Sequence, residues 1–415
     1  MEKIQLRFPG NALTACPALP ASKSESNRAL MMRAYSGEKV EIENLSGARD
    51  TAILASLLEE DPDVYDAHDA GTTLRFLTTY LALKGENRML TGSERMKQRP
   101  VGILVRKLNE LGARISYEEK EGYPPLRFGK GHFEYKPVET DIEPEQSSQF
   151  ISSLLLAAPV FCRGMRLRLH GERVVSRPYI QMSLAMMEKA GISCRMEGNI
   201  ISIDPGPYQP CRISIEPDWS AAGYWLAMLT LAKPGSMVKF DRLSRASLQG
   251  DAAMAGAFEA LGLTFETEGN GLRVCRPDKL RLPEVLQMDF SDMPDQGQTW
   301  IALCAGLGLP FSFTGLETLA LKETNRLAAM KTELIKFGIH LKINEEKGFC
   351  QMDAGRRAIQ PSQCIDTCRD HRMAMSLAPL SMLFDGGIAM ADPGVVVKSY
   401  PGFWEEMRKA GFAAG

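Results

Sequence analysis

The sequence contains no apolar run long enough to span a membrane. The longest candidate, residues 150–160, falls well short of the roughly 20 apolar residues that a spanning helix needs. Residues 1–10 mix charged and apolar side chains in alternation, which predicts a strand, and they lack the continuous apolar core of a signal peptide. We therefore expect a cytoplasmic protein without a membrane partner.

An excess of one charge is also missing. The 49 basic and 51 acidic side chains leave a formal net charge of -2. No global positive field exists to attract nucleic acid, so we expect no nucleic-acid partner. A site for an anionic ligand must therefore be built from a local group of side chains.

Metal and nucleotide signatures are absent as well. None of the nine cysteines forms the two-residue-spaced pairs of a zinc or thioredoxin site, and Cys364 and Cys368 come closest to one. The chain has no GxGxxG sequence after a strand, and neither GxxxxGKS nor GxxxxGKT occurs. We expect free thiols, no metal ion and no cofactor.

What the sequence does contain is a repeated unit. A helix that opens on small or polar residues leads through a Gly- or Pro-marked turn into a short alternating strand, and a second helix and a hairpin follow. The first helices are expected to begin near Ser22, Gly71, Ser147, Ser220, Gln296 and His371. With 415 residues the chain is too long for one core, and we expect two domains of three βαβαββ units each.

Glycines and a proline mark the limits of these units. Four second helices close on Gly112, Gly191, Gly262 and Gly338, where glycine suits the left-handed conformation that ends a helix. Pro217 interrupts a strand between the third and fourth units, so the domain boundary is expected at 215–218.

Basic side chains recur at the starts of the predicted helices. Free backbone N–H groups and the helix dipole favour anions there, so a cation in the first turn is misplaced unless an anion accompanies it. An ordinary surface charge is the alternative at each position, but the recurrence favours anion binding. The residues are Lys23, Arg28, Arg95, Arg99, Arg177, Lys322, Arg326, His371, Arg372 and Lys398.

Neutral donors and acids accompany these cations. The loops 71–73 and 147–149 offer hydroxyl and amide donors to phosphate oxygens. Asp295, Glu323 and His371 would be placed for proton transfer if helix starts from both domains face one cleft. Helix capping by Asp295 and an ion pair of Glu323 with a neighbouring cation are the structural alternatives, and Asp218 is interpreted as a helix N-cap.

Nine segments carry a family resemblance in the expected order along nearly the whole chain. They are PASKSESNRAL, DAGTTLRFL, GSERMKQRPVG, SSQFISSLLLA, VSRPYI, MPDQGQ, LKETNRLAAM, DHRMAMSLA and VKSYPGFW. In these segments the sequence resembles the 5-enolpyruvylshikimate-3-phosphate synthases. The resemblance implies a monomeric enzyme of chorismate and aromatic amino acid biosynthesis, which transfers the enolpyruvyl group of phosphoenolpyruvate to the 5-hydroxyl of shikimate 3-phosphate and releases phosphate.

The implied fold is α/β (α+β), with two domains that are each an inside-out α/β barrel of three βαβαββ units. The expected bounds are 16–217 for the N-terminal domain and 1–15 with 218–415 for the C-terminal domain. The first strand, 4–8, should therefore pair with the C-terminal half. The active site is expected in the cleft between the domains.

The resemblance also assigns residues to each substrate. The implied contacts of shikimate 3-phosphate are Lys23, Ser24, Arg28, Ser147, Ser148, Gln149, Ser176, Tyr179, Asp295, Thr318 and Lys322. Those of phosphoenolpyruvate are Lys23, Asp69, Gly71, Thr72, Arg99, Gln149, Arg326, Arg372 and Lys398. In the implied addition and elimination, Asp295 takes the proton of the 5-hydroxyl, while Glu323, Lys23 and His371 handle the proton at C3 of phosphoenolpyruvate.

The sequence departs from the family pattern at a few positions. Asp69 stands where the family usually has Asn, and Phe76 stands where it has Pro. A carboxylate near an anionic substrate should weaken binding unless it is paired, and Arg75 is the expected partner. Two alternatives remain open: enolpyruvyl transfer to a UDP-sugar, and a non-catalytic homologue that binds anions without releasing phosphate.

Overall fold

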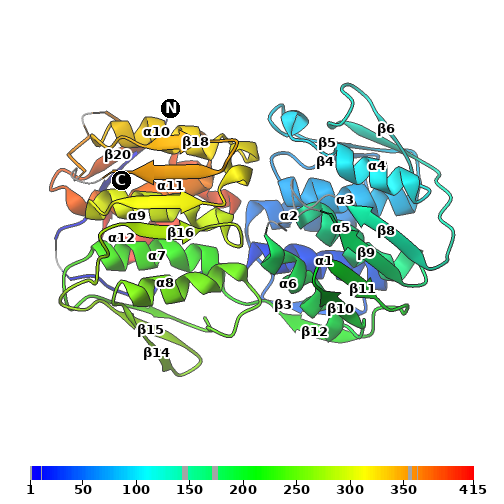
Figure 1. Ribbon diagram of the computed structural model, residues 1–415, viewed down its shortest axis with the longest axis horizontal. Coiled ribbons are helices and arrows are strands. Elements are labelled where there is room, and N and C mark those ends of the chain that lie inside the picture. The colour runs from blue at the N-terminus through cyan, green and yellow to red at the C-terminus, as the bar shows by residue number, and fades with distance from the viewer. Residues whose placement is uncertain (1, 11, 143–147, 171–175, 354–357, 362) are drawn as a thin grey trace. The chain divides into compact units, whose positions relative to one another are not determined.

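The computed structural model describes residues 2–10, 12–142, 148–170, 176–353, 358–361 and 363–415 (Figure 1). The chain forms two compact units. One, which we call the continuous unit, is Ala21–Ile215; the other, the split unit, combines Met1–Pro20 with Glu216–Gly415.

The continuous unit contains six helices and ten strands within the described residues. The helices are α1 (Lys23–Ser36), α2 (Arg49–Glu60), α3 (Gly71–Lys84), α4 (Gly102–Glu110), α5 (Ser148–Phe161) and α6 (Arg177–Lys189). The strands are β3 (Val40–Glu43), β4 (Val64–Asp66), β5 (Arg88–Thr91), β6 (Arg114–Tyr117), β7 (Leu126–Gly129), β8 (Val138–Ile142), β9 (Met165–Leu169), β10 (Cys194–Glu197), β11 (Ile200–Ile203) and β12 (Cys211–Ser214).

The split unit contains six helices and eleven strands within the described residues. Its helices are α7 (Trp219–Leu231), α8 (Met254–Ala260), α9 (Gly297–Leu307), α10 (Arg326–Ile335), α11 (His371–Leu377) and α12 (Phe403–Lys409). Its strands are β1 (Lys3–Arg7), β2 (Thr14–Ala15), β13 (Met237–Phe240), β14 (Thr264–Glu268), β15 (Gly271–Cys275), β16 (Leu286–Asp289), β17 (Phe311–Thr314), β18 (Lys342–Asn344), β19 (Phe349–Met352), β20 (Ile388–Ala391) and β21 (Ala413–Ala414).

Four small sheets share one topology, and this is the structural form of the sequence repeat. In the sheet β4-β5-β7-β6 the first pair is parallel and the other two pairs are antiparallel. The sheets β8-β9-β11-β10, β2-β13-β15-β14 and β16-β17-β19-β18 have the same order and directions. The predicted α/β fold with repeated strand and helix units is therefore confirmed.

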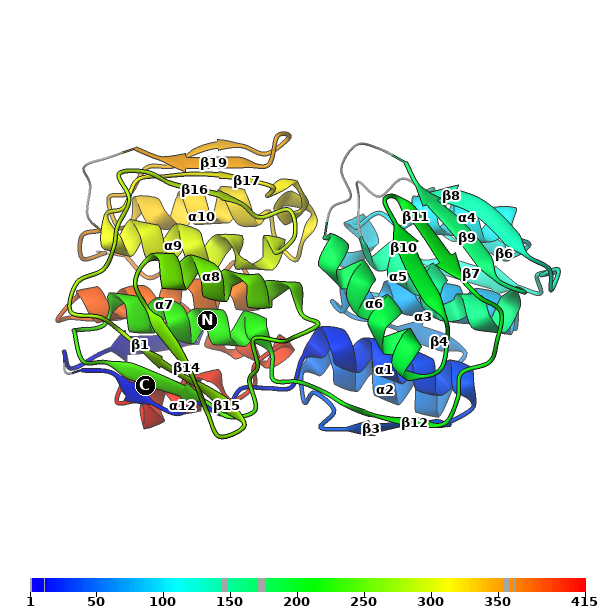
Figure 2. The same cartoon turned by 60° about the horizontal axis from the view of Figure 1, so that its bottom comes forward.

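The first helix of each repeat forms the core of its unit. In the continuous unit α1, α3 and α5 contact one another (Figure 2). In the split unit α9 contacts both α7 and α11. Trp219, Trp225 and Trp300 are fully buried on α7 and α9. Because α7 and α9 are apolar almost all round, burial on every side is the arrangement that removes the most apolar surface from water.

Several elements were correctly predicted from local signals. The helices α1, α3, α7, α9 and α11 begin within one residue of the predicted starts. Gly112, Gly191, Gly262 and Gly338 have φ values of 109°, 80°, 104° and 73°. Asp218 caps α7 by accepting a hydrogen bond from the Ala221 N–H at 3.1 Å. Strand β1 pairs with β20 and β21, as expected for the first strand.

No helix among the described residues is both long and apolar enough to cross a bilayer.

Candidate functional site

The helix starts of the continuous unit bring together the first group of predicted residues. Gln149 Nε2, at the start of α5, donates to Thr72 Oγ1, at the start of α3, at 3.0 Å. Thr73 Oγ1 donates to the Asp50 carbonyl on α2, also at 3.0 Å. Residues 71–73 and 148–149 therefore lie next to each other, as anion-binding loops would. Ser147, another predicted residue, lies outside the described residues.

Arg28 on α1 is a buried cation with neutral partners. Its guanidinium donates to the hydroxyls of Ser183 at 2.8 Å and Ser152 at 3.1 Å, and to the carbonyls of Ser24 at 2.8 Å and Tyr179 at 3.0 Å. Within the described part of the chain no carboxylate forms an ion pair with it, and burial lowers its pKa to about 10. Burial outweighs the stabilising effect of Tyr179 and Glu25 on this charge, and an anionic ligand would offset the remaining cost.

Arg99 is a second cation of this kind. Its side chain is 7% exposed, and among the described residues its Nε has no hydrogen-bond partner and its guanidinium has no ion pair. An ideal Cβ at Gly71 would lie 2.6 Å from Arg99 Nη1. The guanidinium therefore lies against the first residue of α3, where positive charge opposes the helix dipole.

Lys23 differs from these two arginines, because its Nζ lies 3.0 Å from Asp50 Oδ2. A carboxylate partner is therefore present for Lys23 and absent for Arg28 and Arg99 among the described residues, and the binding roles of all three stay predictions. Ser176 precedes α6 with a left-handed φ of 56°, and Tyr179 follows in the first turn with its ring centroid 5.9 Å from the Arg28 guanidinium carbon.

A second group of predicted residues gathers around Asp295 in the split unit. Asp295 belongs to the short helix η3 (Pro294–Gln296), and its carboxylate lies 3.0 Å from Arg326, 3.1 Å from Arg372 and 3.3 Å from Lys322. Burial raises the pKa of Asp295, but Arg372, Lys322 and Arg326 together outweigh burial and hold it well below the ordinary range of an aspartic acid.

Arg326 is the centre of this group. It is 1% exposed and pairs with Asp370 at 2.7 Å, Glu323 at 2.8 Å and Asp295 at 3.0 Å. Burial lowers its pKa, but the three carboxylates raise it above the ordinary range of an arginine. Lys398 reaches the other oxygen of Glu323 at 3.0 Å. The ion pair that was the alternative interpretation of Glu323 is therefore present.

Asp370, which the sequence analysis did not single out, positions the start of α11. Its side chain accepts from the Arg372 N–H at 2.8 Å, and the His371 Nδ1 lies 3.5 Å from the same oxygen. It directly precedes His371, so its position before a helix start was the available signal. Ser152 and Ser183 were also missed, because nothing local in the sequence indicates that they contact Arg28.

The remaining predicted residues are near these groups in sequence. Thr318 lies in η4 (Glu317–Leu321), one turn before Lys322. Asp69 precedes α3 and accepts a hydrogen bond from the Ser93 hydroxyl. Arg75 donates to the carbonyls of Gly71 at 3.0 Å and Pro100 at 3.2 Å, and its expected pairing with Asp69 stays a prediction.

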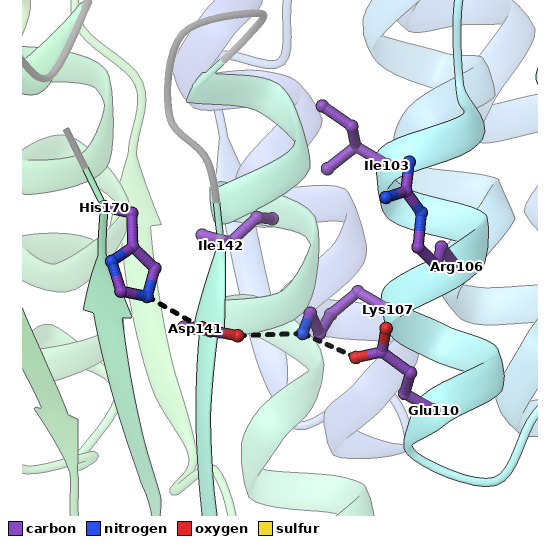
Figure 3. A pocket seen from close by; sticks show the side chains of 7 residues that line it. All are labelled: Ile103, Arg106, Lys107, Glu110, Asp141, Ile142 and His170. Atoms are coloured by element: carbon purple, nitrogen blue, oxygen red, sulfur yellow. Dashed lines mark hydrogen bonds and ion pairs between the residues drawn. The ribbon is translucent and has the colours of Figure 1, made fainter.

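A cavity of about 180 Å³ in the continuous unit contains none of the predicted residues (Figure 3). It lies between α4 and the strands β8 and β9. Apart from Arg106, its charged side chains pair with one another, because Asp141 lies 2.7 Å from His170 and 3.1 Å from Lys107, which also pairs with Glu110 at 2.6 Å. We therefore place the candidate site at the helix starts and not in this cavity.

Comparisons with known proteins identify one enzyme family. The model of the family "EPSP synthase (3-phosphoshikimate 1-carboxyvinyltransferase)" matches residues 53–407. A 3-phosphoshikimate 1-carboxyvinyltransferase of Bacteroides fragilis strain YCH46 is 43% identical over 95% of this chain and 94% of its own length. One from Bordetella petrii is 32% identical over 94% of this chain and 92% of its own.

Solved structures show the same fold. The EPSP synthase from Acinetobacter baumannii superposes with a TM-score of 0.76 at 21% identity, covering 100% of both chains. The enolpyruvyl transferase NikO from Streptomyces tendae does so with a TM-score of 0.74 at 14% identity, covering 100% of this chain and 98% of its own.

Proposed function

The chain belongs to the EPSP synthase (3-phosphoshikimate 1-carboxyvinyltransferase) family, and we propose that the two groups of residues described above carry out that family's reaction. Identity of 43% over nearly the whole chain gives it the carboxyvinyl transferase activity of the shikimate pathway, which leads to aromatic amino acids. The substrates are 3-phosphoshikimate and phosphoenolpyruvate.

One observation carries the assignment of residues: Arg28 and Arg99 are buried cations without carboxylate partners among the described residues. An anion that bound between such groups would regain the electrostatic energy that burial costs them. We assign Arg28 to 3-phosphoshikimate and Arg99, with the backbone of Gly71, to phosphoenolpyruvate. The further contacts assigned to 3-phosphoshikimate are Ser24, Ser147, Ser148, Ser176 and Tyr179. Those assigned to phosphoenolpyruvate are Lys23, Asp69, Thr72 and Gln149. Two of these, Lys23 and Gln149, are assigned to both substrates.

The split unit would supply the remaining groups. Asp295, Thr318 and Lys322 are assigned to the hydroxyls of 3-phosphoshikimate. Arg326, Arg372 and Lys398 are assigned to the carboxylate and phosphate of phosphoenolpyruvate. The charges of the split unit support this assignment of residues to the two substrates. Lys322, Arg372 and Lys398 already lie together as partners of Asp295 and Glu323, so a dianionic ligand could pair with the same cations.

In the proposed reaction, the 5-hydroxyl oxygen of 3-phosphoshikimate bonds to C2 of phosphoenolpyruvate. Its proton passes to Asp295, and a second proton adds at C3 from Glu323, with Lys23 and His371 assisting. The adduct then loses phosphate from C2 and a proton from C3, which restores the double bond. Asp295 becomes an effective base only when substrate anions draw Arg372, Arg326 and Lys322 away from it, because these cations lower its pKa.

The domain organisation is part of the same proposal. Each domain, 16–217 and 1–15 with 218–415, would be an inside-out α/β barrel of three βαβαββ units. Support comes from the shared topology of the four sheets described above. We also propose a cytoplasmic monomer that needs neither metal nor cofactor.

Phosphate release tests this function. The protein is mixed with phosphoenolpyruvate and either 3-phosphoshikimate or UDP-N-acetylglucosamine, and inorganic phosphate is measured. We expect release with 3-phosphoshikimate alone. Release with the UDP-sugar alone would identify the other transferase, and calorimetric binding of both substrates without release would identify a non-catalytic homologue. The variants Lys23→Ala, Arg99→Ala and Asp295→Ala should each lower turnover by orders of magnitude.

A further inference from the structure

Asp251 is a buried carboxylate that the proposed reaction does not use. It lies in the short helix η2 (Gly250–Ala253) and is 2% exposed. Its Oδ2 accepts hydrogen bonds from Gln296 Nε2 at 2.9 Å and from the Ser220 hydroxyl, while its Oδ1 has no partner among the described residues. Burying a carboxylate with so few donors is costly, so a role beyond packing would explain it.

The first link leads from Asp251 to Arg372 through Ser220. A hydroxyl has one proton, and Ser220 gives that proton to Asp251. Its lone pairs are therefore directed elsewhere, and Arg372 Nη2 donates to the Ser220 oxygen at 3.4 Å. If the carboxylate were absent, the hydroxyl could rotate and point its proton at the guanidinium.

The second link leads through Gln296. Gln296 follows Asp295, whose backbone carbonyl lies 3.4 Å from Arg372 Nη1 and whose carboxylate lies 3.1 Å from Arg372 Nη2. By accepting from Gln296 Nε2, Asp251 holds this peptide against α7. The absence of a side chain at Gly223 permits the approach, because a Cβ there would lie 2.4 Å from Gln296 Oε1.

Charge supports the same arrangement. Burial raises the pKa of Asp251, whereas Arg372 and the two hydrogen bonds oppose the rise, and Asp295 adds to it. Arg372 and Asp251 therefore stabilise each other's charged forms although no direct ion pair between them is found in the described structure.

We propose that Asp251 is a positioning residue, which orients Arg372 for phosphoenolpyruvate through Ser220 and Gln296. The inference rests on the proposed function, because Arg372 is assigned there to phosphoenolpyruvate. Asp251 itself contacts no substrate and transfers no proton.

The experiment compares Asp251→Asn, Ser220→Ala and the double variant by steady-state kinetics with each substrate varied. We expect the KM for phosphoenolpyruvate to rise about tenfold in each single variant, while the KM for 3-phosphoshikimate stays within about twofold. Because both residues act through one chain of contacts, the KM for phosphoenolpyruvate in the double variant should not exceed that of the more impaired single variant.

Glu333→Gln is the matched control. Glu333 is also a buried carboxylate of the split unit, but its partners are Lys336 and the Asp366 N–H. This variant should lower the melting temperature and leave both KM values unchanged.

Unchanged KM values for phosphoenolpyruvate in Asp251→Asn and Ser220→Ala would overturn the inference, whatever their melting temperatures. If Asp251→Asn does not fold, Ser220→Ala decides alone, because it removes only one hydroxyl. A wild-type protein that releases no phosphate would overturn the proposed function instead. In that event, calorimetric titration of phosphoenolpyruvate in the presence of 3-phosphoshikimate still decides the positioning role: equal affinity in wild type and Ser220→Ala would refute it.

Discussion

The guanidinium of Arg99 occupies the space in which a side chain at Gly71 would begin. A Cβ at residue 71 would lie 2.6 Å from Nη1, 2.8 Å from Nη2 and 2.9 Å from the guanidinium carbon. Gly71 is therefore required by the position of Arg99 and not by its backbone conformation, since it is not among the glycines with positive φ. A substitution there tests the site without straining the chain.

Gly71→Ala should displace the Arg99 guanidinium by about 1 Å and raise the KM for phosphoenolpyruvate by tenfold or more. The melting temperature should change little, because the atom that must move is the end of a long side chain. Gly47→Ala is the control, since a Cβ at Gly47 would meet nothing within 4 Å. An unaltered KM in Gly71→Ala would show that Arg99 does not contact the substrate.

Replacing Arg99 should separate stability from function. Its guanidinium has no ion pair among the described residues, so Arg99→Met removes a burial cost and should leave the melting temperature unchanged or raised. Phosphoenolpyruvate added to saturating 3-phosphoshikimate should raise the melting temperature of the wild type further and should fail to do so in the variant. Thermal unfolding with and without substrates measures both effects, and a large loss of stability without substrates would contradict the prediction.

Arg326→Met should behave in the opposite way. This guanidinium neutralises Asp370, Glu323 and Asp295. Its removal leaves the fully buried Asp370 without its arginine partner, while Asp295 and Glu323 keep other cations. Losses for breaking a buried ion pair are about 3–5 kcal/mol. Denaturant unfolding should show a clearly lower free energy of unfolding for Arg326→Met and an unchanged one for Arg99→Met. Equal losses in the two variants would refute the distinction between the two arginines.

The low pKa of Asp295 predicts how its contribution depends on pH. Because its pKa is lower in the folded chain than in the unfolded chain, Asp295 stabilises the fold above about pH 4, and this contribution is lost as the pH falls below that value. The difference in melting temperature between wild type and Asp295→Asn should therefore shrink below pH 4. Leu303→Ala, which removes a buried apolar side chain, should show a difference that does not depend on pH in this way.

Asp69→Asn tests the departure from the family pattern. Asp69 is exposed and accepts a hydrogen bond from the Ser93 hydroxyl. Its negative charge lies two residues before Gly71 in the sequence. Removing the charge should lower the KM for phosphoenolpyruvate by a few-fold at low salt, because solvent screens the repulsion. The effect should fade at high ionic strength. A raised KM would mean that the carboxylate assists binding, through Ser93 or another donor.

The helices and strands were predictable because their signals are local. Caps such as Asp218, closing glycines such as Gly262 and the alternation of short strands act within a few residues. Arg28 and Arg99 could also be proposed as anion ligands from their residue type and their place in the repeat. The partners of Arg28 were not, because Ser183 is 155 residues away along the chain.

The sequence by itself determined the repeat, the helix starts, the absence of a global charge and the family. It could not determine which cations are neutralised, because that depends on carboxylates from distant segments. Only the tertiary structure decided that Lys23 lies beside Asp50 while Arg99 has no such partner in the described chain. Asp251 and Ser220 are likewise distant in the sequence, and only the tertiary structure brings the Asp251 carboxylate to the Ser220 hydroxyl. Through this contact we propose that Asp251 orients Arg372.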